Sequence, residues 1–191
     1  MAHGSEWQKE RFLPGIAAGE NTVAPGYYET EGGSDLAVLK TSARQDAEGF
    51  VVNGNKLWTS GAESADFVWL AARTDPTQAR HKGISLLIVD TTTPGFSHTL
   101  IPTTSIPTTA TYYDNVRVPN DMLVGELHGG WKLITSQLNH ERLGLGTWSD
   151  KVVALFRRVY LWARARDEQG HRAMDKAWAV SYTHLTLPTK A

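Results

Sequence analysis

Two short stretches of the chain carry residue types suited to binding a planar, anionic ligand. Residues 27–37 (Tyr-Tyr-Glu-Thr-Glu-Gly-Gly-Ser-Asp-Leu-Ala) contain a glycine-rich turn, which can expose backbone N–H groups and the Ser34 hydroxyl to an anion such as a diphosphate. Residues 56–62 (Lys-Leu-Trp-Thr-Ser-Gly-Ala) present the flat ring of Trp58 beside hydroxyl groups, as a planar heteroaromatic ligand requires. From residue types alone, the first stretch can also be a plain loop, and Trp58 can also be a core residue.

A third stretch, Asn-His-Glu-Arg at residues 139–142, places charged groups within a helical pattern. Charge runs are often only solvated pairs, and residue types alone leave that interpretation open for Glu141 and Arg142. Residues 144–149 (Gly-Leu-Gly-Thr-Trp-Ser) match part of a dinucleotide fingerprint, but they do not follow a strand, so a Rossmann site is not predicted. The seven histidines show no helical i, i+4 pair and no short metal-ligand spacing, so no metal site is predicted.

The composition excludes several classes of protein. With 41% hydrophobic and 20% charged residues, the chain has the balance of a globular protein, and its longest apolar run, residues 84–89, is too short to span a membrane. Nineteen basic residues against 20 acidic ones give a net charge of −1, which argues against a nucleic-acid binder. The absence of cysteine excludes disulfides, thiolate catalysis and cysteine-bound metal, and it suits the reducing cytoplasm, which is the expected location.

The elements that must position these stretches are mainly β-strands. Between about Thr22 and Gly125, short runs of β-branched and aromatic residues alternate with Gly, Pro, Asn and Asp, which is typical of an antiparallel β domain. The pair Asn53-Gly54 between two apolar runs predicts a two-residue hairpin turn. Strands are expected at residues 37–44, 50–53, 55–60, 67–73, 84–90, 96–101 and 110–116.

Helical patterns flank the β region. Residues 6–18 carry spaced apolar side chains, but Pro14 is expected to interrupt any long helix there. Further along, apolar residues recur from Trp131 at intervals of three, four and seven, which predicts a helix after a loop at Gly129-Gly130 and up to about Ala165. The apolar stripe of this helix needs partners. The expected divisions of the chain are a helical segment at 1–21, a β domain at 22–126, a helical region at 127–180 and a tail at 181–191. The tail is either non-native, similar to translated adapter sequence, or a natural disordered terminus.

Short motifs recur in order along most of the chain, from about Gly4 to Val180. They are Glu-Trp-Gln-Lys-Glu-Arg-Phe-Leu-Pro-Gly-Ile (6–16), Gly-Ser-Asp (33–35), Lys-Leu-Trp-Thr-Ser-Gly (56–61), Ala-Asp (65–66), Ala-Arg-Thr-Asp-Pro (72–76), His-Lys-Gly-Ile-Ser (81–85), Thr-Pro-Gly (93–95), Asp-Asn-Val-Arg-Val-Pro (114–119), Val-Gly-Glu (124–126), Gly-Trp (130–131) and Glu-Arg (141–142). Together they closely resemble the acyl-CoA dehydrogenase family of flavoenzymes. The resemblance implies an α+β fold: the end of a helical domain, an antiparallel, barrel-like middle domain and a long helix from an incomplete bundle.

The resemblance implies FAD as the cofactor, held in part by the glycine-rich stretch. Ser34 matches the family serine that bonds the FAD diphosphate and lies near the acyl-CoA. Tyr27 and Tyr28 fall in the segment that lines the isoalloxazine ring. Two residues depart from the family pattern, since Tyr28 stands where Ser or Thr is usual and Thr30 where Pro is usual. The hydroxyl that normally helps to hold the flavin is therefore missing or replaced by a phenol.

The second stretch would complete the cofactor site. Trp58 resembles the family tryptophan that packs on the flavin, and Ser60 resembles the hydroxyl that bonds the flavin around N5. Thr59, between them, belongs to the same cofactor-binding set. We expect Trp58 and Ser60 to share one face of a strand, because residues two apart in a strand point the same way.

The reaction implied is α,β-dehydrogenation of an acyl-CoA thioester, in which a carboxylate removes the α-proton and the β-hydrogen leaves as hydride to the flavin N5. Asn139 and Arg142 match positions that contact the CoA moiety. In some family members the base lies on the long helix immediately before the arginine, which here is Glu141. In most members it is a glutamate far downstream, so both positions remain open for the base.

The resemblance also implies partners and rival functions. The expected partners are an acyl-CoA substrate, electron-transfer flavoprotein or a similar acceptor, and further copies of the chain in a homo-oligomeric full-length enzyme. This fragment alone is expected to have little activity. The alternatives are an acyl-CoA oxidase, a nitroalkane-oxidase-like flavoprotein, and a catalytically silent β module that binds CoA or protein.

Overall fold

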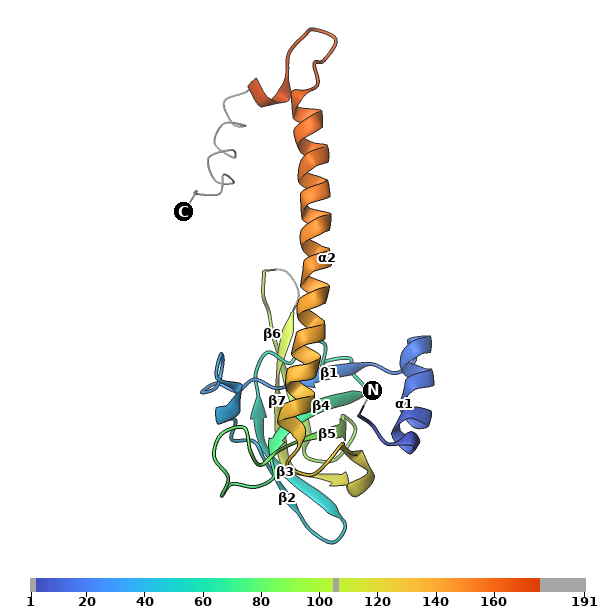
Figure 1. The fold of residues 1–191 in the computed structure, drawn as a ribbon, viewed down its shortest axis with the longest axis vertical. Coiled ribbons are helices and arrows are strands. Elements are labelled where there is room, and N and C mark those ends of the chain that lie inside the picture. Colours follow the sequence, from blue (N-terminus) through green and yellow to red (C-terminus); the bar gives the residue numbers. More distant parts are fainter. Residues whose placement is uncertain (1–2, 105–106, 176–191) are drawn as a thin grey trace. The chain divides into compact units, whose positions relative to one another are not determined.

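The computed structural model describes residues 3–104 and 107–175. The chain divides into two compact units, one up to Gln137 and one from Leu138 onward. The first unit contains a β-sheet and helix α1 (Glu6–Ala18), and the long helix α2 (Gly130–Arg164) begins in this unit and ends in the second (Figure 1). No helix in the described ranges is both long enough and apolar enough to cross a membrane. The predicted tail at 181–191 lies outside the described residues.

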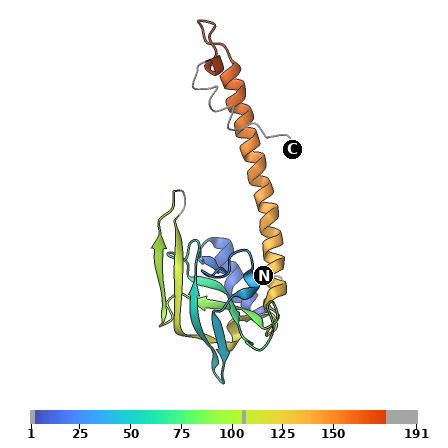
Figure 2. The ribbon, with the colours of Figure 1, turned by 90° about the vertical axis from the view of Figure 1, so that its left-hand side faces the viewer.

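The sheet of the first unit is mixed and open. Its eight strands, counted over the described residues, are β1 (Val23–Gly26), β2 (Ser42–Gln45), β3 (Gly49–Lys56), β4 (Phe67–Arg73), β5 (Ile84–Asp90), β6 (Phe96–Ile101), β7 (Thr108–Pro119) and β8 (Leu123–Val124). They follow the order β6-β7-β3-β2-β4-β5-β8, with β1 beside β4. Figure 2 shows β6 and β7, in yellow-green, at one edge of the sheet. The predicted fold class, a β domain followed by a long helix, is confirmed. The pairings of β1 and β2 with β4 are parallel, however, so the sheet is not purely antiparallel. Its strand order runs from β6 to β8 without pairing these two ends, so it does not close into a barrel.

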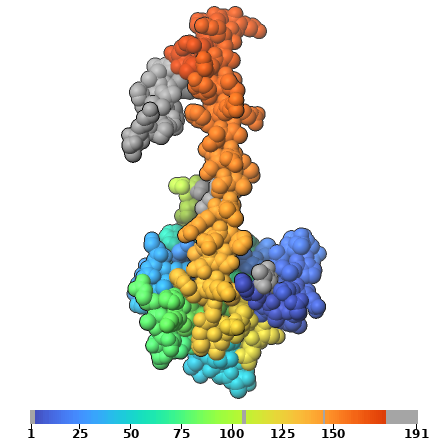
Figure 3. All heavy atoms as spheres, in the orientation of Figure 1, coloured from blue at the N-terminus to red at the C-terminus, as the bar shows by residue number. Residues whose placement is uncertain are grey.

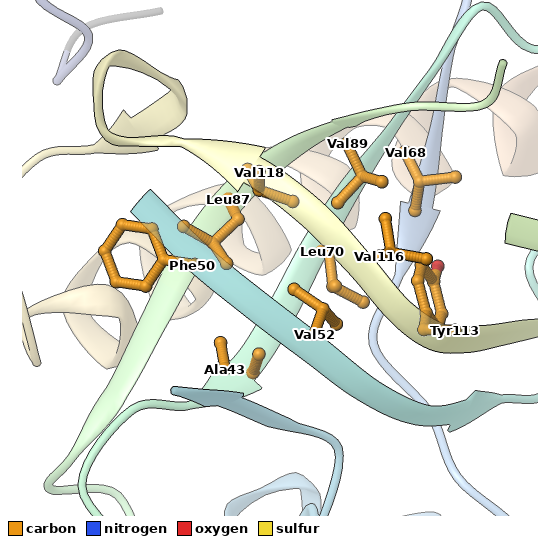
Figure 4. Packing of buried hydrophobic residues seen from close by; sticks show 11 residues of the cluster. Ala43, Phe50, Val52, Val68, Leu70, Leu87, Val89, Tyr113, Val116 and Val118 are labelled. Atoms are coloured by element: carbon orange, nitrogen blue, oxygen red, sulfur yellow. The ribbon is translucent and has the colours of Figure 1, made fainter. Parts of the chain in front are cut away.

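One face of the sheet holds the main hydrophobic core (Figure 4). Phe50 and Val52 of β3 meet side chains of β4, β5 and β7, and Leu70 and Leu87 are fully buried among them. Burying each such side chain stabilises the fold by roughly 1.5–3 kcal/mol. β4 and β5 are buried along almost their whole length, which explains why their sequences are continuous apolar runs without alternation.

Helix α1 covers part of the other face. Phe12 is buried and packs edge-on against Phe67 of β4, with ring centroids 5.1 Å apart. The prediction that Pro14 interrupts this helix is wrong, because the helix runs through it to Ala18. Proline removes one hydrogen bond to the carbonyl of Glu10, and both residues are exposed, so water can satisfy that carbonyl.

The predicted hairpin at Asn53-Gly54 is wrong. β3 continues through both residues, and the turn to β2 lies at residues 46–48. Gly54 instead marks a bulge, where the pairing of β3 with β7 shifts register. Its φ is 142°, and a Cβ there would lie 2.8 Å from the Cα of Thr41. The glycine therefore serves a close approach between backbones and not a tight turn.

The predicted strands from residue 67 onward agree with the structure more closely than the predicted strands before it. The predictions for β4, β5 and β6 agree with the structure at both ends, and β7 is longer than predicted. The predicted strand at 37–44 is correct only at its end, because residues 42–44 lie in β2 whereas residues 37 and 38 lie in the 3₁₀ turn Leu36–Val38. The predicted strand at 55–60 ends at Lys56 within β3. β1 and β8 were not predicted, because four and two residues are too few to show a pattern.

The predicted long helix is confirmed as α2, which has 35 residues. Beyond Gln137, none of its described side chains is buried. Figure 3 draws this part of the helix in orange. Among its described side chains, ten large apolar ones are exposed. They are Leu143, Trp148, Val152, Val153, Leu155, Phe156, Val159, Tyr160, Leu161 and Trp162.

Candidate functional site

The glycine-rich stretch forms an exposed loop after β1. Tyr27 is buried, and its hydroxyl donates a hydrogen bond to the side-chain carbonyl of Gln137. Tyr28 is 37% exposed, and Ser34 is also exposed. A Cβ at Gly33 would meet nothing within 4 Å, so the backbone beside Ser34 is open to an approaching group. This loop therefore offers an exposed hydroxyl and open space beside its backbone, both of which an anion-binding loop requires.

Trp58 lies in a strained backbone conformation directly after β3. Its φ is 62°, in the left-handed region that bulky residues seldom adopt, and its side chain is 52% exposed. The backbone of the next residue, Thr59, is held at both its N–H and its carbonyl by Thr109 of β7. The N–H of Thr59 donates to the Thr109 carbonyl at 2.9 Å, and the Thr109 hydroxyl donates to the Thr59 carbonyl. Surroundings that fix a strained residue in this way are typical of ligand-binding sites.

Buried hydroxyls support the same segment from inside the sheet. Thr59 is fully buried, with its Oγ1 3.4 Å from that of Thr111, which in turn lies 3.2 Å from the Tyr113 hydroxyl. Burial raises the pKa of Tyr113 well above its ordinary value, so this phenol stays protonated. Ser60 is exposed, and its Oγ lies 3.2 Å from the Thr108 Oγ1.

The expectation that Trp58 and Ser60 follow one another along a strand is wrong, since β3 ends at Lys56. The two side chains are nevertheless both exposed, and Thr59 between them is buried. The turn at Trp58 therefore presents an aromatic ring and a hydroxyl to solvent while keeping Thr59 inside.

The first two stretches lie side by side. The N–H of Leu57 donates to the Tyr28 carbonyl at 2.8 Å, which joins the end of β3 to the start of the glycine-rich loop. The third stretch belongs to the second unit, where Asn139, Glu141 and Arg142 are all exposed. Arg142 donates to the side-chain oxygen of Asn139 at 3.3 Å. The structure thus joins the first two stretches through Tyr28 and Leu57, and the predicted substrate residues lie together on α2 in the second unit.

A buried ion pair behind these stretches was not predicted. The Nζ of Lys56 lies 2.8 Å from Glu29 Oε1 and 3.2 Å from the Tyr27 carbonyl, and Lys56 is fully buried. Glu29 also accepts hydrogen bonds from the backbone N–H groups of Lys40 and Thr41, at 2.7 and 2.9 Å. One signal was available in the sequence: Lys56 has the same parity along β3 as the core residues at 50 and 52.

The pair has shifted pKa values with opposing causes. Burial lowers the pKa of Lys56 to about 8, because the neighbouring Glu29 carboxylate only partly offsets the loss of hydration. Burial acts to raise the pKa of Glu29, but the Lys56 charge and the hydrogen bonds that Glu29 accepts outweigh it and hold this pKa below its ordinary value. At neutral pH both groups are therefore charged.

The first unit also has a cationic hollow of about 440 Å³ that was not predicted. Lys82 and Lys132 line it together with one acidic residue, Asp75, and with the rings of His81, His128 and Trp131, so the two lysines outnumber the single carboxylate. The rings of His81 and Trp131 lie 6.0 Å apart, and the His128 Nδ1 lies 2.8 Å from a threonine hydroxyl. Cationic and aromatic side chains in one hollow suit a nucleotide phosphate. Over the described ranges, no three residues of metal-binding type are grouped as a metal site requires.

Comparisons with known proteins agree with this architecture. Residues 24–116 match the family model described as acyl-CoA dehydrogenase, middle domain. Acyl-CoA dehydrogenase FadE29 of Mycobacterium tuberculosis is 51% identical over 177 residues, which are 92% of this chain and 46% of that protein. Among solved structures, the Tcur3481-Tcur3483 steroid ACAD is 46% identical with a TM-score of 0.84, covering 97% of this chain and 48% of that one. The ChsE4-ChsE5 complex from Mycobacterium tuberculosis is 46% identical with a TM-score of 0.81, covering 97% of this chain and 49% of that one.

The match extends over nearly all of this chain, whereas the chain spans about half the length of the relatives it matches. The matched model covers β1 through most of β7, the strands that carry the exposed Trp58 and the glycine-rich loop. By fold, motifs and relatives alike, the chain belongs to the acyl-CoA dehydrogenase family.

Proposed function

We propose that the protein to which this chain belongs is an FAD-dependent acyl-CoA dehydrogenase, which oxidises the α,β carbon–carbon bond of an acyl-CoA thioester. The observation that carries the proposal is the strained, half-exposed Trp58, held next to Ser60 and joined through Leu57 to the glycine-rich loop. A flat ring, a hydroxyl and open backbone N–H groups are the features needed to hold a planar ring that is attached to a diphosphate.

The donor set of the first unit fits FAD. Trp58 would stack on the ring system, Ser60 would bond its edge near N5, and Ser34 would bond the diphosphate and lie near the acyl-CoA. Tyr27 and Tyr28 would line the ring from the loop side. Thr59 is buried, so its side chain would act by fixing the backbone on either side of it. When bound, FAD supplies the acceptor for the substrate's β-hydride.

The remaining residues of this chain would serve the substrate. Asn139 and Arg142 would contact the CoA moiety, and the lysines of the cationic hollow would neutralise nucleotide phosphates. The Glu141 carboxylate would take the proton from the substrate α-carbon, which requires that the carboxylate reach hydrogen-bond distance of that atom in the assembled enzyme. In the competing proposal, the catalytic base is a glutamate further downstream that is not part of this 191-residue sequence.

The names of the relatives suggest a substrate class and an assembly to test. One solved relative is described as a steroid ACAD, so we propose CoA thioesters with steroid side chains as the first substrates to try. Two relatives pair two different names, Tcur3481-Tcur3483 and ChsE4-ChsE5, so assembly with a related chain is the alternative to the homo-oligomer. We further propose a cytoplasmic location and electron-transfer flavoprotein or a similar acceptor as the electron sink.

The test uses the purified full-length enzyme. We expect a yellow protein with a flavin absorption spectrum that bleaches when an acyl-CoA is added without oxygen, and that reduces an artificial dye in turnover. The 191-residue chain alone should reduce the dye little or not at all. Peroxide formation with oxygen in place of dye reduction would indicate an oxidase, and absence of flavin from the enzyme would indicate a silent binding module.

A further inference from the structure

The buried pair of Lys56 and Glu29 lies at the junction of the two stretches proposed to hold FAD. Glu29 directly follows Tyr28 in the glycine-rich loop, and Lys56 is the last residue of β3, two positions before Trp58. The 2.8 Å contact between their charged groups therefore joins the two halves of the proposed site behind the exposed surface.

The pair fixes backbone groups as well as each other. Lys56 donates to the carbonyl of Tyr27, and Glu29 accepts the N–H groups of Lys40 and Thr41, where the chain returns from the glycine-rich loop. Both ends of this loop are therefore held by the same two side chains. The exposed fractions of these side chains are 0% for Lys56 and 10% for Glu29, so water does not compete strongly for these bonds.

A general gain in stability is a poor explanation for such a pair. Two buried charges lose their hydration, and apolar residues of similar size often stabilise a core equally well or better. What an apolar pair does not supply is the set of directed bonds to one carbonyl and two N–H groups, which fixes the path of the loop.

We propose that Lys56 and Glu29 are positioning residues for the cofactor, setting the distance and angle between the ring-binding segment at Trp58 and the diphosphate-binding loop at Ser34. This inference rests on the proposed function, because it assigns the pair to a flavin site. Neither side chain touches the ligand, and both act through the backbone that carries the ligand-binding groups.

The experiment compares three forms of the full-length enzyme. The double variant Lys56→Met/Glu29→Gln removes both charges while keeping similar volumes. The control is Lys40→Ala, which removes the exposed ion pair of Lys40 with Glu31 in the same loop and leaves the buried pair intact. Each form is stripped of flavin, and the measurements are the thermal midpoint without ligand, the FAD dissociation constant and the absorption spectrum of the bound flavin.

We expect the double variant to unfold cooperatively near the parent midpoint but to bind FAD about tenfold or more weakly, with a shifted flavin spectrum. The control should stay within about twofold of the parent. A purely structural pair would change the midpoint and leave the dissociation constant and the spectrum unchanged, and that result would overturn the proposal. If the double variant does not fold, Glu29→Gln alone is measured in the same way and read by the same criterion.

The outcome also separates this inference from the proposed function. A parent enzyme that binds no FAD contradicts the proposed function, and the positioning role is then contradicted with it. A parent that binds FAD tightly, together with a double variant that binds it equally tightly, contradicts the positioning role alone.

Discussion

Large apolar side chains are buried in the sheet of the first unit but exposed in the part of α2 beyond Gln137. In the sheet, Phe50, Leu70 and Leu87 are fully buried, whereas in that part of the helix Phe156 is 58% and Trp162 is 62% exposed. A helix with a wide apolar surface becomes stable by packing against partner surfaces. The sheet therefore folds around its own core and can carry the proposed cofactor site, whereas the groups on the helix depend, under the proposed function, on partner surfaces.

The largest expected effect concerns the helix. In the full-length enzyme, Glu141→Gln should slow the reduction of bound flavin by substrate about 10²–10⁴-fold, because the amide cannot accept the α-proton. Stopped-flow absorbance would measure this, with FAD content and acyl-CoA affinity as controls that should remain near the parent values. Near-normal reduction would assign the base to another carboxylate and leave the helix a binding role only.

The contrast in packing itself predicts unequal costs for the same substitution. Phe50→Ala in the 191-residue chain should lower the free energy of unfolding by about 3–5 kcal/mol, because it leaves a cavity in a closed core. The matched change Phe156→Ala should alter it by less than about 0.5 kcal/mol. Urea titration followed by circular dichroism would compare them, and similar losses in both variants would show that the helix residue is packed.

The buried pair of the sheet predicts a pH dependence. The pKa of Lys56 is about 8 in the folded state, below the ordinary value of 10.5, so the unfolded chain binds more protons between these values. Below about pH 8 the charged, buried Lys56 therefore makes a constant unfavourable contribution, which diminishes as the pH rises to about 10.5, so the free energy of unfolding should rise across this window. Denaturant titrations across this window should show a steeper rise for the parent than for Lys56→Met/Glu29→Gln. Parallel profiles would contradict the lowered pKa.

The smallest effects are expected at the exposed surface of the site. In the full-length enzyme, Trp58→Ala should weaken FAD binding by about 1–3 kcal/mol through lost stacking area. Ser60→Ala should cost about 0.5–1.5 kcal/mol, the value of one hydrogen bond, and should mainly change the flavin redox behaviour. Equilibrium dialysis and a redox titration would measure the two effects. Parent-like behaviour in both variants would place the flavin elsewhere.

The spacing of apolar residues along the sequence predicted the strands and helices whose formation depends mainly on residues close together in the chain. The apolar runs of β4 and β5 and the spacing along α2 predicted those elements well. The sequence pattern gave a wrong prediction at Asn53-Gly54, because Gly54 lies close to the backbone of Thr41, a residue 13 positions earlier that the local pattern does not include. The contact between Lys56 and Glu29, 27 positions apart, was missed for the same reason. Motif order identified the candidate site, but it could not reveal the backbone that holds the site.

The left-handed backbone at Trp58 has a consequence for protein engineering. Glycine adopts a φ of 62° without strain, so Trp58→Gly removes a steric penalty at the same time as it removes the ring. A screen for heat-resistant variants carried out without FAD would therefore tend to enrich glycine at position 58. Such a screen would select against the aromatic surface that the cofactor is proposed to need, which is a trade-off between stability and activity at a single residue.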